Sequence, residues 1–510
     1  MKKHLLYLVI LLLTACQEST QPPTSTLIIP TTLPSSTPTP PIDIPPGENP
    51  LTGQLAADPS LLKIPALLVS ISNFPAIGRP QAGLSFAPYV YEYYITEGAT
   101  RFLAVFYGGF PAPEVSQSGG CTVRSEPFIK TQIIIGNRVW LDTNANGTRD
   151  TDEEGVPGVC VNLYDSTGTQ IQKTTTDTNG YYGFNVPQGK YTVEFVKPKG
   201  MGFTQRIPRN DSRVSDADPL TGRVDVNVSD DLLSVDAGTV SKGNPMPGSN
   251  PSSNQPPAQV GPIRSGRLIY GYIGSYFQNS CLIYAFASPE EQSRIPQCYM
   301  VFHQLAGGGY MLDINELEKV AKDNKKKKGS NFNYTSNLFA DEPPAGGIPA
   351  SKLNIYIAYQ NQSGWFYDPL YQAYLRYVDT SEYDQAGILH ADTDRLTGRQ
   401  LHFENVIVLF ARHEVISPTN LDIHLNKGKT GQALLFRDGQ MYEIKWSTEP
   451  NEDEQTTGMK HPIQFLNLND SPAPLKPGHT WILVVTPDST VQEKSAGEWT
   501  LTFSQPPGAK

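Results

Sequence analysis

A twelve-residue stretch, DTNANGTRDTDE, holds the residues of this chain best suited to bind a metal ion. Oxygen-bearing side chains stand at alternate positions, a glycine follows them, and two carboxylates close the stretch: Asp142, Asn144, Asn146, Gly147, Asp150 and Glu153. Calcium takes about six to eight oxygen ligands from loops of this kind, in which the glycine supplies a sharp turn. The spacing therefore predicts a structural calcium ion.

The flanks of this loop indicate what the ion would do. IGNRVWLD precedes the loop and EEGVPGVCVNLYD follows it, and both have the residue pattern of strands. A calcium sensor of the helix-loop-helix type needs two helices that move apart. We therefore expect calcium to stabilise a long loop between strands by offsetting the repulsion of its carboxylates, and not to drive a conformational switch.

The surrounding residues 120–240 are predicted to be all-β, since turns such as DTNGYYG and VPQGKY recur at the spacing of a β-sandwich. IGNRVWLDTNANGTRDTDEEGVPGVCVNLYD, TTTDTNGYYGFNVPQGKYTVEF and VDAGTV resemble the SdrD B-like domain of bacterial surface proteins. The resemblance implies an immunoglobulin-like sandwich that binds calcium, and it adds the main-chain carbonyl of Thr148 to the ligands. Only three of the ligands are charged, which favours the weaker affinities of extracellular modules.

The start of the chain is typical of an exported protein. Residues 1–15 combine two lysines, a short apolar run and small residues, as signal peptides do. LTAC resembles the bacterial lipobox, which implies that Cys16 becomes the lipidated N-terminal residue. Residues 16–50 are rich in Thr, Pro and Ser and predict an extended tether. We expect a lipid-anchored protein on the extracytoplasmic face of a bacterial cell membrane.

The cysteines agree with an oxidising compartment. Besides Cys16 the chain has Cys121, Cys160, Cys281 and Cys298, an even number that predicts one or two disulfides. The spacing leaves their connectivity open. A formal net charge of −10 argues against a nucleic-acid partner.

The chain is too long for one core, and its composition divides it. Residues 51–118 hold too few strand candidates to close a core, so we expect their partners beyond a second Pro/Ser-rich linker, residues 241–260. The sandwich would then be inserted into a host formed by residues 51–118, 261–350 and 351–487, followed by a tail, residues 488–510. We expect a multidomain fold: an α/β first half of the host, a β-rich second half and an all-β insert.

The host segments resemble a second family. NPLTG, RPQAGLSFAPYVYEYYITEGATRFLAVF, GPIRSGR, TGRQLHFENVIVLF, GQALLFRDGQ and LKPGHTWILVV are similar to the YerB-like lipoproteins, whose domain is of unknown function (domain of unknown function 3048). Two stretches depart from that family's pattern: YAFAS and SNFNY stand where the family has histidine-containing motifs. Any activity that needs those histidines is placed in doubt for this chain.

The host offers one polar group of candidate site residues: Glu92, Glu97, Arg101, Arg264 and Arg267. Two carboxylates could act as acid and base beside arginines that hold an anion. The alternative is an ion-pair network that joins the two halves of the host. HADTD, with His390, Asp392 and Asp394, could hold a metal or form a surface turn. The aromatic stretch GWFYDPLYQAYLRY could bind a sugar or peptide, or could pack in the core.

No catalytic signature is present: the chain lacks the G-x-S-x-G, G-x-x-x-x-G-K-[ST] and H-E-x-x-H motifs. The sequence favours a non-catalytic envelope protein whose host binds a cell-wall polymer or another envelope protein, with calcium as its one cofactor. The alternative is a cell-envelope hydrolase that uses Glu92 and Glu97. Whether the chain is an enzyme stays open at this stage, and no catalytic residue is assigned.

Overall fold

The computed structural model describes residues 44–112, 118–124, 128–198, 201–206, 213–219, 221–241, 258–296, 298–301, 305–306, 309–369, 371–397, 400–450, 454 and 461–510. The predicted signal peptide, Cys16, most of the tether and residues 242–257 of the linker lie outside this range. We call the described residues 44–112 and 258–510 the host, and the described residues 118–241 the insert. None of the helices in the described residues is both long and apolar enough to cross a membrane.

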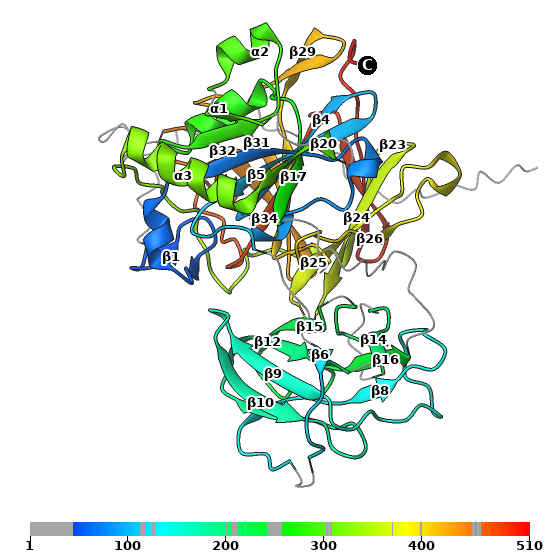
Figure 1. Ribbon diagram of the computed structural model, residues 1–510. Helices are drawn as coiled ribbons and strands as arrows, with labels where there is room; N and C mark the ends of the chain where they lie inside the picture. The colour runs from blue at the N-terminus through cyan, green and yellow to red at the C-terminus, as the bar shows by residue number, and fades with distance from the viewer. Residues whose placement is uncertain are drawn as a thin grey trace, which may run out of the picture. The chain divides into compact units, whose positions relative to one another are not determined.

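One large sheet forms the core of the host (Figure 1). Its strands lie in the order β20, β21, β17, β3, β5, β4, β34, β28, β31, β32 and β22, with β18 paired to β3, β19 to β18, and β33 to β32. Their bounds are Leu305–Ala306 (β20), Gly309–Asp313 (β21), Gln259–Ile263 (β17), Leu67–Ser72 (β3), Ala99–Phe106 (β5), Tyr89–Thr96 (β4), Thr480–Val485 (β34), Asn405–Phe410 (β28), Thr430–Arg437 (β31), Gln440–Ser447 (β32), Ile348–Pro349 (β22), Cys281–Tyr284 (β18), Tyr299–Met300 (β19) and Gln464–Leu466 (β33).

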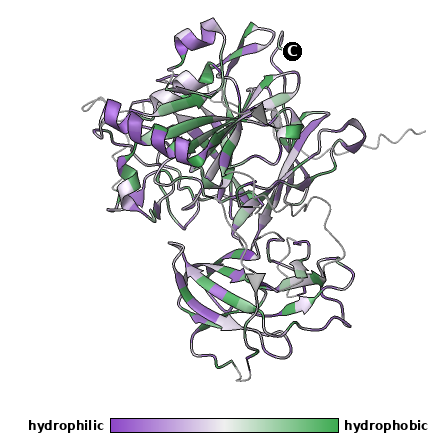
Figure 2. Cartoon of the chain, viewed as in Figure 1, coloured by the Kyte–Doolittle hydropathy of each residue, from purple (hydrophilic) through white to green (hydrophobic). Residues whose placement is uncertain are grey.

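The order of these strands joins segments that are distant in the sequence. The strands β3, β5 and β4 precede the insert, β17 follows it, and β34 comes from near the end of the chain. Strands such as β3 (LLVSIS) and β34 (TWILVV) are buried along their whole length, because the sheet is covered on both faces. Figure 2 shows these central strands largely in the hydrophobic colour.

Three α-helices accompany the sheet: α1 (Ile269–Ser275), α2 (Pro289–Arg294) and α3 (Ile314–Lys328). The predicted cap of α3 is confirmed, since the Asp313 carboxylate accepts the N–H of Asn315 at 2.8 Å. One stripe of α3, with Leu317, Val320 and Ala321, is buried in the core, while the rest of the helix is largely polar (Figure 2).

The expectation of an α/β first half is not confirmed, because strands dominate the host throughout. Among the described residues of the stretch PEEQSRIPQCYMVFHQLA, whose apolar spacing is typical of a helix, only those of α2 are helical. Ile295 is extended, with φ of −113° and ψ of 134°, because the following Pro296 disfavours the helical conformation. The described residues also contain short 3-10 helices: η1 (Pro59–Lys63), η2 (Ala76–Gly78), η3 (Leu84–Phe86) and η4 (Tyr383–Gln385).

A second sheet of the host has the order β26, β25, β24, β23, β36 and β35, with β27 paired to β25. Its bounds are His390–Ala391 (β26), Ala373–Val378 (β25), Asn361–Asp368 (β24), Lys352–Ala358 (β23), Glu498–Thr502 (β36), Thr490–Ser495 (β35) and His402–Phe403 (β27). Two antiparallel pairs stand apart, β1 (Glu48–Asn49) with β2 (Gln54–Leu55), and β29 (His413–Ser417) with β30 (Asn420–Ile423). Residues of both sheets share one hydrophobic core, in which Trp365 of β24 contacts Trp481 of β34.

The insert is all-β, as predicted, and has a core of its own. One sheet has the order β10, β9, β12, β15 and another β14, β16, β8, with smaller pairs β11–β7 and β13–β6. Burial alternates cleanly along β15 (RVDVNV), which is the pattern of a strand with one face in a sandwich core. The bounds are Ser118–Gly119 (β6), Ile133–Ile135 (β7), Val139–Leu141 (β8), Cys160–Asp165 (β9), Gln170–Thr175 (β10), Phe184–Val186 (β11), Gly189–Phe195 (β12), Lys197–Pro198 (β13), Met201–Phe203 (β14), Arg223–Val228 (β15) and Ala237–Ser241 (β16).

Candidate functional site

The predicted calcium loop follows β8 and is folded by its own side chains. The Asp142 carboxylate is buried and accepts the main-chain N–H of Asn146 and of Gly147, at 3.2 and 2.8 Å. Gly147 has φ of +77°, a left-handed conformation that costs glycine little. The side-chain oxygens of Asn144 and Asn146 accept the N–H of Asn146 and of Thr148, at 3.1 and 2.6 Å. These bonds turn the loop back on itself.

Asp150 and Glu153, at the end of the loop, make hydrogen bonds to residues at its start. Both side-chain nitrogens, of Asn144 and of Asn146, donate to one oxygen of Asp150, at 2.8 and 3.1 Å. Glu153 is buried and accepts the N–H of Asp150 at 3.0 Å and that of Thr143 at 2.7 Å. The loop thus draws together the oxygen-bearing side chains that the spacing singled out.

The donor set of the loop suits calcium better than a transition metal. In the described residues no group of three or more histidine, cysteine, aspartate or glutamate side chains is placed to hold a metal, and this includes the loop carboxylates Asp142, Asp150 and Glu153 as they stand. The loop offers a mixture of carboxylate, amide and main-chain oxygens instead, which is the set that a hard cation such as calcium takes. An ion bound at Asp150 would replace the two amide donors from which one of its oxygens now accepts.

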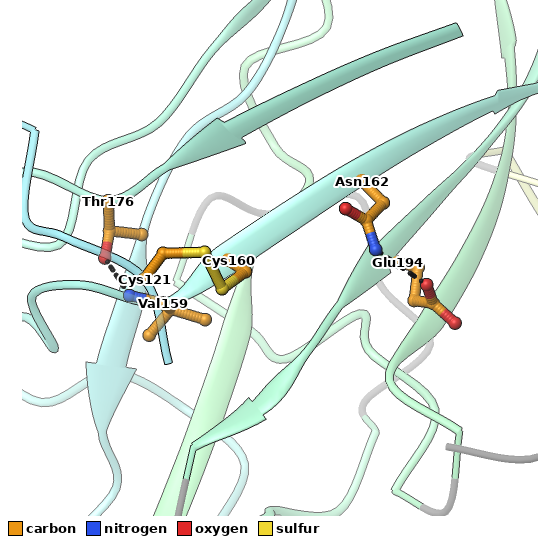
Figure 3. The surroundings of a disulfide bond; sticks show 6 residues. All are labelled: Cys121, Val159, Cys160, Asn162, Thr176 and Glu194. Atoms are coloured by element: carbon orange, nitrogen blue, oxygen red, sulfur yellow. Dashed lines mark hydrogen bonds between the residues drawn. A yellow bond between two sulfur atoms is a disulfide. The ribbon is translucent and has the colours of Figure 1, made fainter. Parts of the chain in front are cut away.

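Both pairs of cysteines form disulfides, Cys121 with Cys160 and Cys281 with Cys298. The first ties the segment that enters the insert to β9 (Figure 3). Beside it, the N–H of Val159 donates to the Thr176 hydroxyl at 2.9 Å, and further along β9 Asn162 donates to the buried Glu194 at 3.0 Å. The entry to the insert is therefore fixed by a covalent bond and by the sheet next to it.

The structure separates the polar residues that the sequence grouped in the host. Glu92 faces Phe102 across the β4–β5 pair, while the neighbouring Tyr93 faces Arg101. Directly opposed residues share a face of a sheet, and adjacent residues lie on opposite faces. Glu92 and Arg101 are therefore on opposite sides of the sheet and do not form one site, which corrects the expectation.

Glu92 belongs to a buried network. Its carboxylate accepts from the Thr100 hydroxyl at 2.8 Å and from the Trp481 ring N–H at 3.1 Å, and it lies 3.7 Å from the guanidinium of Arg376. Arg376 is fully buried, forms an ion pair with Asp392, and lies over the Trp481 ring at 4.8 Å. Glu92 therefore fits the alternative given by the sequence, an ion-pair network that joins distant parts of the host.

Glu97 lies apart from Glu92. It is exposed in the turn between β4 and β5, where it adopts a positive φ of 51° and its N–H donates to the Lys510 carbonyl at 2.5 Å. The acid pair that a hydrolase mechanism would need is not brought together by these two residues.

On the other face, Arg101 meets the segment that follows β17. One guanidinium nitrogen donates to the Ser265 carbonyl at 3.1 Å and to its hydroxyl at 3.0 Å. A nitrogen of Arg267 donates to the same hydroxyl at 2.8 Å. Tyr270 of α1, whose ring lies against Tyr93 at 5.9 Å, closes this side. Arg101, Arg264 and Arg267 do come together, as the sequence predicted.

Three family models match the chain. Two are described as protein of unknown function (DUF3048), an N-terminal domain at residues 51–125 and a C-terminal domain at residues 353–482. The third, the SdrD B-like domain, matches residues 133–239. The chain carries both DUF3048 domains, with an SdrD B-like domain between them. Both resemblances seen in the sequence are thus confirmed, and none of the three descriptions names a reaction.

One solved structure aligns with most of this chain. The YerB protein from Bacillus subtilis aligns with 86% of this chain and 96% of its own, with a TM-score of 0.44 and 16% sequence identity.

The SdrD B-like domain has clear sequence relatives. Serine-aspartate repeat-containing protein F of Staphylococcus epidermidis is 43% identical over 109 residues, which are 21% of this chain and 6% of that protein. The fibrinogen-binding protein of Staphylococcus epidermidis is 44% identical over 118 residues, 23% of this chain and 11% of that protein. Serine-aspartate repeat-containing protein C of Staphylococcus aureus is 40% identical over 114 residues, 22% of this chain and 12% of that protein. The chain thus spans only a small part of these relatives.

The HADTD stretch of the DUF3048 region does not assemble a metal site. His390 is exposed, Asp392 is paired with Arg376, and Asp394 is buried and accepts the N–H groups of Gly83, Ser85 and Leu396 at 2.8–3.0 Å. Burial raises the pKa of Asp394, and its main-chain hydrogen bonds oppose that rise. This carboxylate organises the chain around η3.

The aromatic stretch of the DUF3048 region is also structural at its centre. Trp365 and Tyr374 are both buried, which favours core packing over a binding surface at this point. Arg376, which lies in this same stretch, was not among the residues predicted from the sequence. A charged residue within the apolar strand AYLRYV was the available signal, since a buried charge needs a partner.

Proposed function

We propose that this protein is a lipid-anchored envelope protein on the extracytoplasmic face of a bacterial cell membrane, where its DUF3048 host binds a cell-wall polymer or another envelope protein without catalysis. The lipobox-like LTAC and the tether support the anchor. Two disulfides support an oxidising compartment. The similarity of the insert to staphylococcal surface proteins supports a location at the cell surface.

The observation that carries the non-catalytic role is the state of the two candidate acids. Glu92 is 2% exposed and engaged by Thr100, Trp481 and Arg376, so it has neither solvent access nor a free face. Glu97 stands exposed in the turn between β4 and β5, whereas Glu92 is buried in the sheet, so the two acids do not flank one site. Most glycoside hydrolases need two carboxyl groups that flank one bond.

Binding to the wall is tested by sedimentation. The full chain is incubated with purified cell-wall polymer and calcium, and after centrifugation the pellet is assayed for protein and the supernatant for released fragments. We expect protein in the pellet and no fragments. Protein that stays in the supernatant would count against the wall polymer and leave another envelope protein as the proposed partner. Released fragments that disappear with Glu92→Gln would contradict the non-catalytic role.

The insert is proposed to bind a structural calcium ion through Asp142, Asn144, Asn146, Asp150, Glu153 and the Thr148 carbonyl. Calcium binds only the folded loop, so it should stabilise the insert by RT ln(1 + [Ca]/Kd), about 2.7 kcal/mol at a hundredfold excess over Kd. Calorimetry of the full chain with calcium and with chelator measures this. Asp150→Ala should abolish the difference.

A matched control is available in the same domain. Asp165 lies in the β9–β10 turn, where it accepts the N–H groups of Thr167 and Thr169 but has no second carboxylate in the loop. The Asp165→Asn variant should keep the full calcium response. An identical melting curve with calcium and with chelator in the unmodified chain would exclude the ion.

A further inference from the structure

Three arginines of the host gather on the face of the large sheet that α1 covers. Arg101 comes from β5, and Arg264 and Arg267 come from the segment that joins β17 to α1. The pKa of Arg101 is lowered to about 10, chiefly by burial, and the charges of Arg267 and Arg264 contribute to this lowering. Burial and Arg267 also lower the pKa of Arg264. The three guanidinium groups are close enough to repel one another.

The main chain fixes the positions of the two later arginines. The N–H of Arg264 donates to the Ser70 carbonyl of β3 at 3.1 Å, and the Arg264 carbonyl accepts from Ala285 at 3.0 Å. Gly261 precedes them with φ of +136°, and a Cβ there would lie 2.9 Å from the nitrogen of Ile263. The segment therefore holds its arginines on a rigid support, which a binding site requires.

The donors of this cluster outnumber its acceptors. Arg101 and Arg267 share the Ser265 hydroxyl through one nitrogen each, and each also uses a main-chain carbonyl. The Nε atoms of both are buried and have no hydrogen-bond partner within the described residues. No hydrogen bond or ion pair of the Arg264 guanidinium is present there either. Buried donors without partners are rare in folded proteins and call for an explanation.

The charge of the cluster is also uncompensated. One carboxylate approaches it, Glu291, at 3.7 Å from Arg267. Glu291 is already engaged, since its other oxygen accepts the Ser288 N–H at 2.9 Å in the capping box of α2. Across the described part of the chain, no ion pair of Arg101 or Arg264 with a carboxylate is found.

A second buried arginine of the host, Arg376, contrasts with Arg101. Arg376 is as deeply buried as Arg101, but it faces the two carboxylates Asp392 and Glu92. The protein alone explains the burial of Arg376, whereas no carboxylate of the described residues forms an ion pair with Arg101. Access is available, because Arg264 and Arg267 are partly exposed at the edge of the cluster.

We propose that Arg101, Arg264 and Arg267 bind a phosphate group, as an ester or as the free ion. Guanidinium groups match the oxygens of phosphate in pairs of charge-assisted hydrogen bonds, and three of them suit its several oxygens better than the two of a carboxylate. The inference rests on the proposed binding function and specifies its ligand as a phosphorylated compound of the envelope.

The test titrates the full chain with inorganic phosphate, glycerol phosphate and a glycerophosphodiester, with acetate at matched ionic strength as the comparison anion. Thermal shift and calorimetry give the affinity.

We expect phosphate to bind more tightly than acetate. The Arg264→Met variant should weaken the affinity for phosphate at least tenfold. No hydrogen bond or ion pair of the Arg264 side chain is found in the described residues, so we expect this variant to fold even if Arg101→Met does not. Binding of the esters identifies the source as a phosphorylated compound; binding of the ion alone identifies free phosphate.

The control is Arg412→Met. The Arg412 side chain is 72% exposed and pairs with Glu414, which is not part of the three-arginine cluster. This variant should leave phosphate affinity unchanged. Equal affinity for acetate, no binding of phosphate by the unmodified chain, or equal binding of phosphate by Arg264→Met would each overturn the proposal.

Sedimentation with wall polymer tests the proposed wall binding separately from the phosphate site. Phosphate binding without sedimentation supports the site and counts against the wall as the partner. If the chain binds no phosphate, and Arg264→Met sediments with the wall polymer as well as the unmodified chain does, the phosphate site is overturned but the proposed wall binding is not.

Discussion

Replacing Arg376 with methionine is expected to lower the free energy of unfolding of the host by about 3–5 kcal/mol. Arg376 is 0% exposed and forms an ion pair with Asp392, and Glu92 lies 3.7 Å away. Its guanidinium also lies over the rings of Phe102 and Trp481. Without it, two buried carboxylates lose their positive partner, and a buried charge without a partner is costly. Urea unfolding followed by tryptophan fluorescence measures the change.

Two further variants isolate the cause. Arg412→Met removes an arginine whose side chain is 72% exposed, so it should change stability by less than about 0.5 kcal/mol. Adding Glu92→Gln and Asp392→Asn to Arg376→Met removes the charges left behind and should restore part of the loss. A loss of similar size in Arg376→Met and Arg412→Met would show that the buried network is not what holds these strands together.

Removing the Cys121–Cys160 disulfide is the second large effect. The two cysteines are 39 residues apart, and closing a loop of that length restricts the unfolded chain by about 3–4 kcal/mol. The double variant Cys121→Ser, Cys160→Ser should destabilise the insert by that amount. Hydrogen exchange read by mass spectrometry measures it peptide by peptide, so the insert and the host are followed separately.

The second disulfide provides the matched comparison. Cys281 and Cys298 are 17 residues apart in the host, so Cys281→Ser with Cys298→Ser should cost about 3 kcal/mol there. The insert and the host have separate hydrophobic cores, so each double variant should act on its own part. Faster exchange spread evenly over both parts in either variant would contradict this separation.

The calcium loop shows what local spacing can predict. Asp142, Asn144, Asn146 and Gly147 act on main-chain groups a few residues away, so their order in the sequence already dictates the turn. The strands around the loop were predictable for the same reason, because alternation of apolar residues is a local pattern. The α2 region was predicted poorly, since Pro296 ends a helix that the apolar spacing would have continued.

The host site shows what spacing leaves undecided. Glu92 and Arg101 stand in adjacent strands and looked like members of one group, but the pairing register of β4 with β5 puts them on opposite faces. Register depends on the turn and on burial, and a shift by one residue would exchange the two faces. The partner of Glu92, Arg376, is 284 residues further along the chain and could not be chosen from spacing.

The sequence by itself determined the order of the segments, the insert and its family, the polar side chains of the loop and the arginines of GPIRSGR, because each depends on residues near one another in the chain. Only the tertiary structure decided the two disulfide pairs, the burial of Glu92 against Arg376, and the meeting of Arg101 with Arg264 and Arg267, of which only Arg267 has a carboxylate, Glu291, nearby in the described residues. The physical reason is that the large sheet pairs strands from both sides of the insert, and the faces of those strands are set by long-range pairing.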